Sequence, residues 1–380
     1  MLSGTKPVVI DLFAGAGGLS LGASRAGFYV CSSVEIDRHA IETHSKNFPS
    51  CIHISEDVAS LSGRRLLELS NVSAGGLDGL IGGPPCQGFS HIGRNDVQDE
   101  RNSLFTHFFR LVSETKPKFF VAENVPGILH SKYDGICNEA FEYVKDYVLL
   151  KPLKVTASDF GAPTTRTRVF FIGYNSKHIS TDFDAEIIKM AETKSDDVRV
   201  GRALQGLPVK ISPEWQTEAS GWRGVDVCGY HGRFGHKLCG EIPESVGYAP
   251  AIERLHEKRE VSGCIGTRHS NDVEDRYRAL LPREVDRITR SPRLDAEWYC
   301  PTLRAGTGPE HGSYQAVRPI HPTEARVITP REAARLQGFP DWFVFHATKW
   351  HSFRQIGNSV CPIVAEEILK LIYSAIGHTS

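Results

Sequence analysis

The chain has 380 residues, a formal net charge of −1 and a hydrophobic content of 40%. This is ample material for a packed core, in two domains or in one large domain with a sizeable insertion. No apolar run reaches the ~20 residues of a membrane span, and the N-terminal residues do not resemble a signal peptide. The nine cysteines include no Cys-x-x-Cys pair, which argues against a disulfide framework and a zinc ribbon and for a reducing cytosol. A near-zero net charge neither indicates nor excludes a nucleic-acid partner, because acids elsewhere can offset a local basic face.

The first half of the chain alternates predicted strands and helices. Strands are expected over residues 7–12, 29–36, 51–54, 77–81, 118–123, 153–158 and 167–173. Helices are expected over residues 18–26, 38–47, 63–70, 103–113 and 136–149. Repeated strand–helix units predict a parallel, doubly wound α/β sheet with helices on both faces. Such sheets bind ligands at the carboxyl ends of their strands, and three candidate segments follow Leu12, Ile81 and Ala122.

The second half is less regular. From about residue 181 to 329 the alternation is lost, and we expect a second domain of short strands and loops. Helical order returns where Thr329 and Glu332 form a capping box. Gly338 is expected to end that helix. A final amphipathic helix over residues 363–375 is expected to return to the first domain.

The segment Gly-Gly-Pro-Pro-Cys-Gln-Gly-Phe-Ser at residues 82–90 follows a predicted strand. Its prolines fix their own φ angles and remove two backbone donors, so neither a strand nor a helix continues easily through them. Cys86 is therefore expected at the rim of the sheet, where a stiff turn can display it as a nucleophile. On this segment alone, a small buried hydrophobe is about equally well supported, since that is the usual fate of a free cysteine.

The glycine-rich segment at residues 11–18 lies between the first strand and the first helix. Its glycines let the backbone approach a ligand closely, and the helix start offers free N–H groups. Ser20 stands where a dinucleotide fingerprint would have its last glycine. Glu35 ends the second strand, where an acid commonly accepts hydrogen bonds from ribose hydroxyls, and Asp57 follows the third. These features favour a nucleoside-bearing cofactor over the alternative, a tight structural turn with two surface acids.

Charged residues follow two further strands. Glu123 ends a strand at the same sheet edge as Cys86, and it is a candidate proton donor or hydrogen-bond anchor, or a surface acid. Strand alternation places Arg166 and Arg168 on one face. Two neighbouring guanidinium groups repel each other unless an anion or a carboxylate lies between them. An anionic substrate and an internal ion pair with Glu123 both remain open.

Taken in order, six segments closely resemble the DNA (cytosine-5-)-methyltransferase family. The matching segments are residues 11–18, 84–90, 123–125, 165–168, 331–340 and 355–360. Thr165 departs from the pattern, because the family usually has glutamine there. The irregular region coincides with the variable target-recognition domain of the family. The resemblance thus implies a Rossmann-like, S-adenosylmethionine-dependent methyltransferase sheet with an inserted, irregular small recognition domain.

The resemblance also implies a mechanism. Cytosine is a poor carbon nucleophile, so Cys86 would add as a thiolate to carbon 6 of the ring and make carbon 5 electron-rich. Glu123 would hold or protonate ring nitrogen 3, Arg166 would orient Glu123, and Arg168 would contact the base carbonyl or the region of the nucleophile. Asn124 would support the loop. The target cytosine must first be flipped out of the duplex.

The implied cofactor is S-adenosyl-L-methionine, with S-adenosyl-L-homocysteine as the product. The implied contact residues are Phe13, Gly15, Gly17, Leu19, Glu35, Ile36, Asp57, Val58, Pro84, Leu104, Asn358 and Val360. If Asn358 touches the cofactor, the C-terminal segment must fold back onto the first domain. We therefore expect a catalytic domain over residues 1–180 and 350–380. Residues 181–349, including a helix over 329–341, would form the recognition domain.

The implied partner is double-stranded DNA. Candidate DNA contacts are Gln87, Ser90, Arg94, Arg101, Arg233, Arg268 and Arg304. Each of the three in the recognition region is expected more often to contact a phosphate or solvent than to read a base. We further expect a monomer in the cytoplasm, associated with the nucleoid and without a metal ion. Its role would be restriction-modification or host or phage DNA modification, and whether a cognate restriction endonuclease accompanies it stays open. Two alternatives stay open, a transfer RNA substrate and a catalytically inactive relative.

Overall fold

The computed structural model describes residues 6–85, 103–179, 183–192, 197–226, 230–240, 242–305 and 318–377. Cys86, Gln87, Ser90, Arg94 and Arg101 therefore lie outside the described residues, and the predictions made for them stay predictions. Within the described ranges, no helix is both long enough and apolar enough to cross a membrane.

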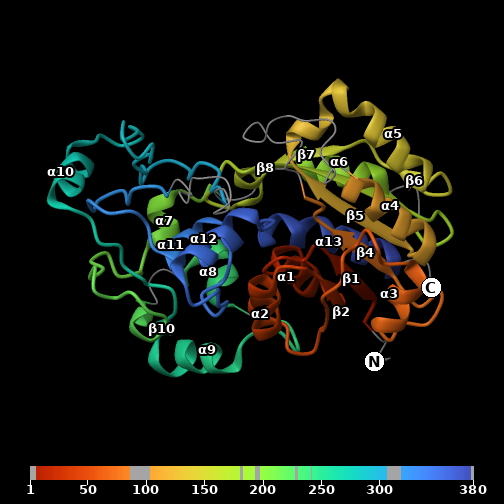
Figure 1. Cartoon of the computed structure of the whole chain (residues 1–380), viewed down its shortest axis with the longest axis horizontal. Coiled ribbons are helices and arrows are strands. Elements are labelled where there is room, and N and C mark those ends of the chain that lie inside the picture. The colour runs from red at the N-terminus through yellow and green to blue at the C-terminus, as the bar shows by residue number, and fades with distance from the viewer. Residues whose placement is uncertain are drawn as a thin grey trace.

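An eight-stranded sheet forms the centre of the larger lobe, on the right in Figure 1. Its strands are β1 (Val8–Leu12), β2 (Tyr29–Val34), β3 (Ile52–Ile54), β4 (Gly79–Gly82), β5 (Phe119–Asn124), β6 (Val148–Leu149), β7 (Leu153–Thr156) and β8 (Thr167–Tyr174). Their order is β3-β2-β1-β4-β5-β8-β6, and β7 also pairs with β8. Strands β3 to β5 of this order run parallel, which confirms the predicted doubly wound sheet. The remaining pairings, β5–β8, β8–β6 and β8–β7, are antiparallel.

Helices cover both faces of this sheet, as predicted. They are α1 (Gly18–Ala26), α2 (Arg38–Asn47), α3 (Gly63–Leu69), α4 (Ser103–Thr115), α5 (Asp134–Glu142), α6 (Phe183–Glu192) and α13 (Pro362–Gly377). Alternate strand residues enter two separate cores. Val9 and Phe119 pack in the core that contains α1, α6 and α13. Ile10 and Phe120 pack in the core that contains α3, α4 and α5.

Two differences from the predicted elements lie in this lobe. The helix expected over residues 136–149 ends at Glu142, and Val148 and Leu149 instead pair with β8. Strand β8 has backbone groups available for pairing, which the local sequence of residues 148–149 does not show. This tertiary context decides that these residues form a strand. Helix α6 was not predicted, and it packs in the core beside the sheet through Phe183 and Ile187.

The smaller lobe consists of short elements joined by long loops (Figure 1). The loops were predicted, but most of the regular elements are short helices where short strands were expected. Its helices are α7 (Val200–Leu204), α8 (Gly232–Cys239), α9 (Ala249–Glu253), α10 (Asn271–Ala279), α11 (Pro330–Leu336) and α12 (Lys349–Asn358). Strands β9 (Arg223–Gly224) and β10 (Glu260–Val261) form a two-stranded sheet. Single helical turns lie in both lobes. Those of the larger lobe are Pro126–Leu129, Ser131–Tyr133 and Ala157–Phe160, and those of the smaller lobe are Ala219–Gly221 and Arg254–Lys258. Helix α12 was not predicted; Gln355 ties it to α2 by donating to the His39 carbonyl at 2.9 Å.

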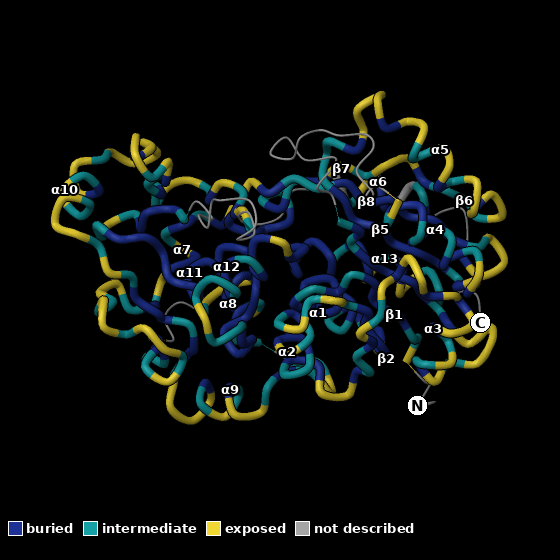
Figure 2. The backbone as a smooth tube through the Cα atoms, in the orientation of Figure 1, coloured by how far each residue is buried: buried dark blue, intermediate teal, exposed yellow. Residues whose placement is uncertain are grey.

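Helix α11 forms where the capping box was predicted. The Thr329 side chain accepts from the Glu332 backbone N–H, and the Glu332 carboxylate accepts from the Thr329 N–H. Gly338, at φ 88°, follows the helix end. The helix is buried along its whole length, as the dark tube in Figure 2 shows.

Helices α1 and α13 lie in close contact, which brings the end of the chain back to its beginning. A Cβ atom on Gly22 would lie 2.3 Å from the Cβ of Ala365, and one on Gly18 would lie 2.3 Å from the carbonyl oxygen of Val360. Neither distance is possible between real atoms, so the two helices can approach this closely only because α1 carries glycines here.

We predict that Gly22→Ala lowers the free energy of unfolding by about 2 kcal/mol, because the added methyl group must push α13 away. Urea denaturation followed by circular dichroism measures the loss. Gly135→Ala is the matched control: it is also a helical glycine, but a Cβ there meets nothing within 4 Å. A Gly22→Ala variant as stable as this control would contradict the packing argument.

Candidate active site

The carboxyl ends of β4 and β5 lie side by side, because the two strands pair in parallel. Pro84, in the segment that leads toward Cys86, is buried. The buried Asn124 side chain donates from Nδ2 to the Pro84 carbonyl at 3.3 Å. Asn124 Oδ1 also accepts from the Val125 N–H at 2.8 Å. This is the contact expected of a residue that supports the loop.

Glu123 and Arg168 form an ion pair at this edge of the sheet. The distance between Arg168 Nε and Glu123 Oε1 is 2.8 Å, and Glu123 is 8% exposed. A Cβ atom on Gly83 would lie 3.2 Å from Glu123 Oε2, so the glycine leaves the space beside this oxygen open. The internal ion pair that the sequence left open is therefore present. The resemblance assigned the orienting of Glu123 to Arg166, but Arg168 makes this ion pair.

Arg166 lies on the same side of the sheet as Arg168, as strand alternation predicted. Both line a small hollow together with Val360 and Cys361. Arg166 is buried, and its Nη1 donates to the Leu303 carbonyl at 3.3 Å. The hollow thus brings together the predicted catalytic residues Arg166 and Arg168 and the predicted cofactor residue Val360. Arg166 also connects it to the smaller lobe through its hydrogen bond to Leu303.

The glycine-rich turn after β1 is held by Glu35 at the end of β2. Glu35 Oε2 accepts from the Gly15 N–H at 2.9 Å, and Oε1 accepts from the N–H groups of Ile36 and Asp37 at 2.8 and 2.9 Å. Phe13 and Gly15 both have positive φ angles, 58° and 57°. Sequence reasoning gave Glu35 a ligand-binding role and missed that the same carboxylate shapes the turn.

The remaining predicted cofactor residues lie around the same edge of the sheet, at or beyond the strand ends or on the adjoining helices. Ile36 is 69% exposed beside Glu35. Asp57 is exposed and accepts from the Ala59 N–H at 2.9 Å, while Val58 next to it is buried. Gly17 directly precedes α1 and Leu19 lies in its first turn, Leu104 lies in the first turn of α4, Asn358 ends α12, and Val360 lies between α12 and α13. The return of the C-terminal segment is what places the last two here.

Three predicted DNA contacts lie within the described residues. Arg233 pairs with Glu367 of α13, at 2.8 Å. Arg268 pairs with Glu214, and both side chains are largely exposed. Arg304 is exposed, and its backbone lies against α12, where a Cβ on Gly357 would be 2.7 Å from the Arg304 carbonyl carbon. Their roles toward DNA stay predictions.

Sequence reasoning missed Asp11, which lies below the glycine-rich turn. It is fully buried, and Ser20 Oγ donates to its Oδ2 at 2.5 Å. Burial raises the pKa of Asp11 to about 7, against the hydrogen bonds from Ser20, and the charge of Glu35 adds to the increase. The sequence signal for Asp11 was an acidic residue within an otherwise apolar strand, Val-Val-Ile-Asp-Leu. The apolar neighbours of Asp11 in this strand indicate that it is buried.

Known proteins resemble this chain along nearly its whole length. The sequence profile of the family described as C-5 cytosine-specific DNA methylase matches residues 8–374. The type II methyltransferase M.XorII of Xanthomonas oryzae is 37% identical over 377 residues, which cover 96% of this chain and 84% of that protein. The type II methyltransferase M.DdeI of Desulfomicrobium norvegicum is 33% identical over 394 residues, which cover 96% and 88% of the two chains.

Solved structures show the same similarity. A protein provisionally described as a DNA modification methyltransferase encoded within a prophage (E. coli) has a TM-score of 0.86 at 51% identity, with 98% of this chain and 100% of that chain covered. The Schizosaccharomyces pombe Dnmt2 methyltransferase has a TM-score of 0.58 at 15% identity, with 97% and 98% covered, and shares the fold. Because the family profile spans nearly the whole sequence, the chain belongs to the C-5 cytosine-specific DNA methylases, the enzymes that methylate carbon 5 of cytosine in DNA.

Proposed function

We propose that a cytosine flipped out of double-stranded DNA is received at the carboxyl ends of β4 and β5, with Cys86 as the nucleophile and Glu123 as the group that holds ring nitrogen 3. The observation that carries this proposal is the Glu123–Arg168 ion pair at the carboxyl end of β5, beside the strand end that leads toward Cys86. A carboxylate fixed by an arginine and flanked by a glycine is already positioned to meet a ring, so little reorganisation is needed during the reaction.

In this proposal the covalent step is divided between Cys86 and Glu123. The Cys86 thiolate forms a bond to carbon 6, and Glu123 supplies or holds the proton at ring nitrogen 3 that neutralises the added charge. Carbon 5 becomes nucleophilic and takes the methyl group. A base then removes the carbon 5 proton, and the bond between the sulfur and carbon 6 breaks, which releases Cys86 unchanged.

We further propose that the methyl donor is S-adenosyl-L-methionine, bound along the carboxyl ends of β1 to β4. When bound, this cofactor supplies an electrophilic methyl group on its sulfonium. The residues present fit it: a Cβ on Gly15 would meet no atom within 4 Å, so the turn borders open space. Glu35 uses three of its roughly four acceptor sites for backbone N–H groups. One site on Oε2 remains for a ribose hydroxyl.

The smaller lobe and the C-terminal return complete the proposed enzyme. Asn358 and Val360 would close the cofactor pocket, and Arg268 and Arg304, both exposed, would contact DNA phosphates or bases. The described relatives carry the name type II methyltransferase. We therefore propose a modification enzyme paired with a restriction endonuclease, acting as a monomer on DNA of the nucleoid.

The direct test is methyl transfer from labelled S-adenosyl-L-methionine to double-stranded DNA by the full chain. We expect transfer by the wild type and no detectable transfer by Cys86→Ala, because carbon 5 is not activated without the thiolate. DNA containing 5-fluorocytosine should form an adduct that survives denaturation with the wild type alone. Transfer to transfer RNA in place of DNA, or full activity of Cys86→Ala, would overturn the assignment.

We predict that Glu123→Gln lowers kcat for methyl transfer by at least about a hundredfold, since proton transfer by a positioned side chain typically contributes 10²–10⁴-fold. The amide has no acidic proton to supply to ring nitrogen 3. Glu139→Gln, an exposed glutamate on α5, is the matched control and should keep full activity. Equal activity of the two variants would remove Glu123 from the mechanism.

We predict that Glu35→Gln weakens S-adenosyl-L-methionine binding about tenfold, because an amide cannot accept at both ends and the Gly15 N–H or the ribose loses its partner. Isothermal titration calorimetry measures the dissociation constant. Glu42→Gln, an exposed change on α2, should leave it as in the wild type. If Glu35→Gln binds as tightly as Glu42→Gln, the ribose assignment fails.

A further inference from the structure

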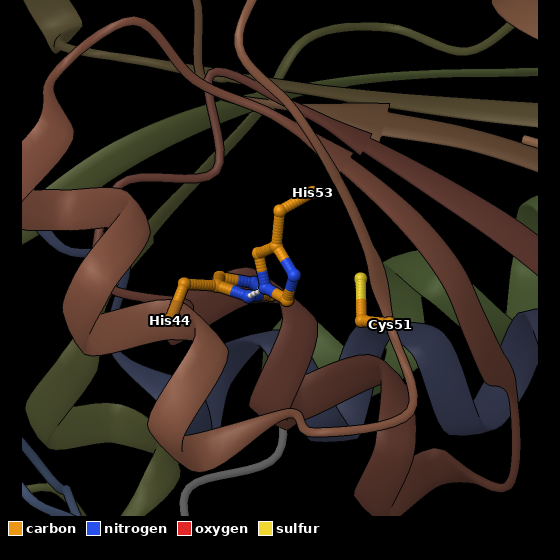
Figure 3. A group of neighbouring side chains, drawn as sticks. All are labelled: His44, Cys51 and His53. Carbon is orange, nitrogen blue, oxygen red and sulfur yellow. Dashed lines mark hydrogen bonds between the residues drawn. The ribbon is translucent and has the colours of Figure 1, made fainter. Parts of the chain in front are cut away.

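Three side chains with metal-binding atoms meet outside the proposed catalytic site. They are His44 near the end of α2, Cys51 just before β3 and His53 within β3 (Figure 3). One ligand atom from each lies within 4.8 Å of the others. Cys51 and His53 are two positions apart in extended chain, a spacing that places side chains on one side of a strand. Methyl transfer as proposed above uses none of the three.

A second layer of groups orients His44. While Asp11 is ionised, Ser20 Oγ donates to Asp11 Oδ2 at 2.5 Å, so the Ser20 oxygen must accept from His44 Nε2, 3.0 Å away. A neutral His44 with its proton on Nε2 has a free lone pair on Nδ1. This Nδ1 faces His53 Nε2 at 2.9 Å. Metal-binding histidines are held in this way, with the outer nitrogen donating toward a carboxylate and the inner nitrogen left as the ligand.

The charges around the cluster suit a divalent cation. Asp11 is fully buried, and among the described residues its Oδ1 has no hydrogen-bond partner. Binding of a metal ion releases the thiol proton of a cysteine ligand. A Cys51 thiolate and the Asp11 carboxylate together would then balance two positive charges inside the protein, where an unbalanced charge is costly.

We propose that His44, Cys51 and His53 form a binding site for one zinc ion. Two imidazole nitrogens and one thiolate are a donor set that zinc prefers. With Zn–N bonds of about 2.0–2.1 Å, two nitrogens on a tetrahedral ion lie about 3.3 Å apart, so the 2.9 Å separation of the imidazoles must widen by a few tenths of an ångström. His53 is only partly buried, and a water molecule entering past it would be the fourth ligand.

A second cluster of possible ligands, formed by His39, Glu42 and His346, does not meet the same conditions. The Thr348 backbone N–H donates to His346 Nδ1 at 3.0 Å, which fixes the proton of the neutral ring on Nε2. Nε2 is the atom that faces His39 Nδ1, at 3.1 Å, so His346 directs an N–H and not a lone pair into that cluster. This second cluster therefore serves as a control site, because the neutral His346 ring carries its proton on the nitrogen that a metal ion would need.

Zinc at the proposed site would brace the glycine-rich turn. The His44 ring stacks on Phe48 with centroids 4.3 Å apart. A Cβ atom on Gly17 would lie 2.4 Å from the Phe48 ring and 3.0 Å from the His44 ring. The turn therefore rests directly on the side chains that a bound ion would fix.

The test uses Co²⁺ as a spectroscopic probe on the full chain, freed of metal by a chelator under reducing conditions. We expect one equivalent of Co²⁺ to give visible bands typical of tetrahedral coordination and a near-ultraviolet thiolate-to-cobalt band, both displaced by Zn²⁺. Cys51→Ser should lose the thiolate band. Cys31→Ser is the matched control, because Cys31 is also buried and lies on the neighbouring strand β2 but outside the cluster.

A second measurement separates metal binding from misfolding. Zn²⁺ should raise the thermal unfolding midpoint of the wild type, of Cys31→Ser and of His39→Asn, and should leave that of His53→Asn unchanged. His53 is partly exposed, so this variant is expected to fold. Absence of a thiolate band in the wild type, or a band that persists in Cys51→Ser or His53→Asn, would overturn the proposal.

Discussion

The contact between α1 and α13 is the constraint on which the site depends. Gly18 and Gly22 have no side chains, so the backbone of the C-terminal segment can lie directly against the first helix. This contact sets Val360 and Cys361 opposite Arg166 and Arg168 across one hollow. Residues separated by about 190 positions in the sequence thus line one hollow, and a methyl group on either glycine would displace its C-terminal side.

The smaller lobe is organised by buried arginines. Arg335 makes two hydrogen bonds to Asp341, at 2.9 and 2.5 Å, and also donates to carbonyls of residues 203 and 205. Arg331 donates to the carbonyls of Ser262 and Phe343, at 2.8 and 2.7 Å. Removing two guanidinium groups from water is costly and is offset only when nearly every donor finds an acceptor. These bonds tie the backbone at residues 203, 205, 262 and 343 to helix α11.

The contrast between the two lobes explains what the sequence could predict. Helices α1 and α2 were predicted at their observed bounds, and α11 begins where its Thr329 cap predicted, because glycine turns and caps are local signals. The helix expected over residues 329–341 ends at Leu336, before Gly338. The helix expected to reach residue 149 was wrong beyond Glu142, since the pairing of β6 with β8 is a long-range choice. Short helices of the smaller lobe such as α7 pack against α11, which lies far from them in the sequence, so local signals could not predict them. In the site, alternation predicted the shared face of Arg166 and Arg168, but it could not show which of them meets Glu123.

The glycine-rich turn is held from two sides, which explains how a flexible sequence can present a fixed surface. On the outer side of the turn, the Gly15 N–H donates a hydrogen bond to the Glu35 carboxylate. Ser20, bound to Asp11 and facing His44, anchors the helix that follows it from within. Three glycines in a row of eight residues would otherwise cost considerable conformational entropy on binding, since glycine has the most freedom to lose. Because that entropy is lost during folding, the turn can keep the glycines that close approach of a ligand requires without weakening the binding.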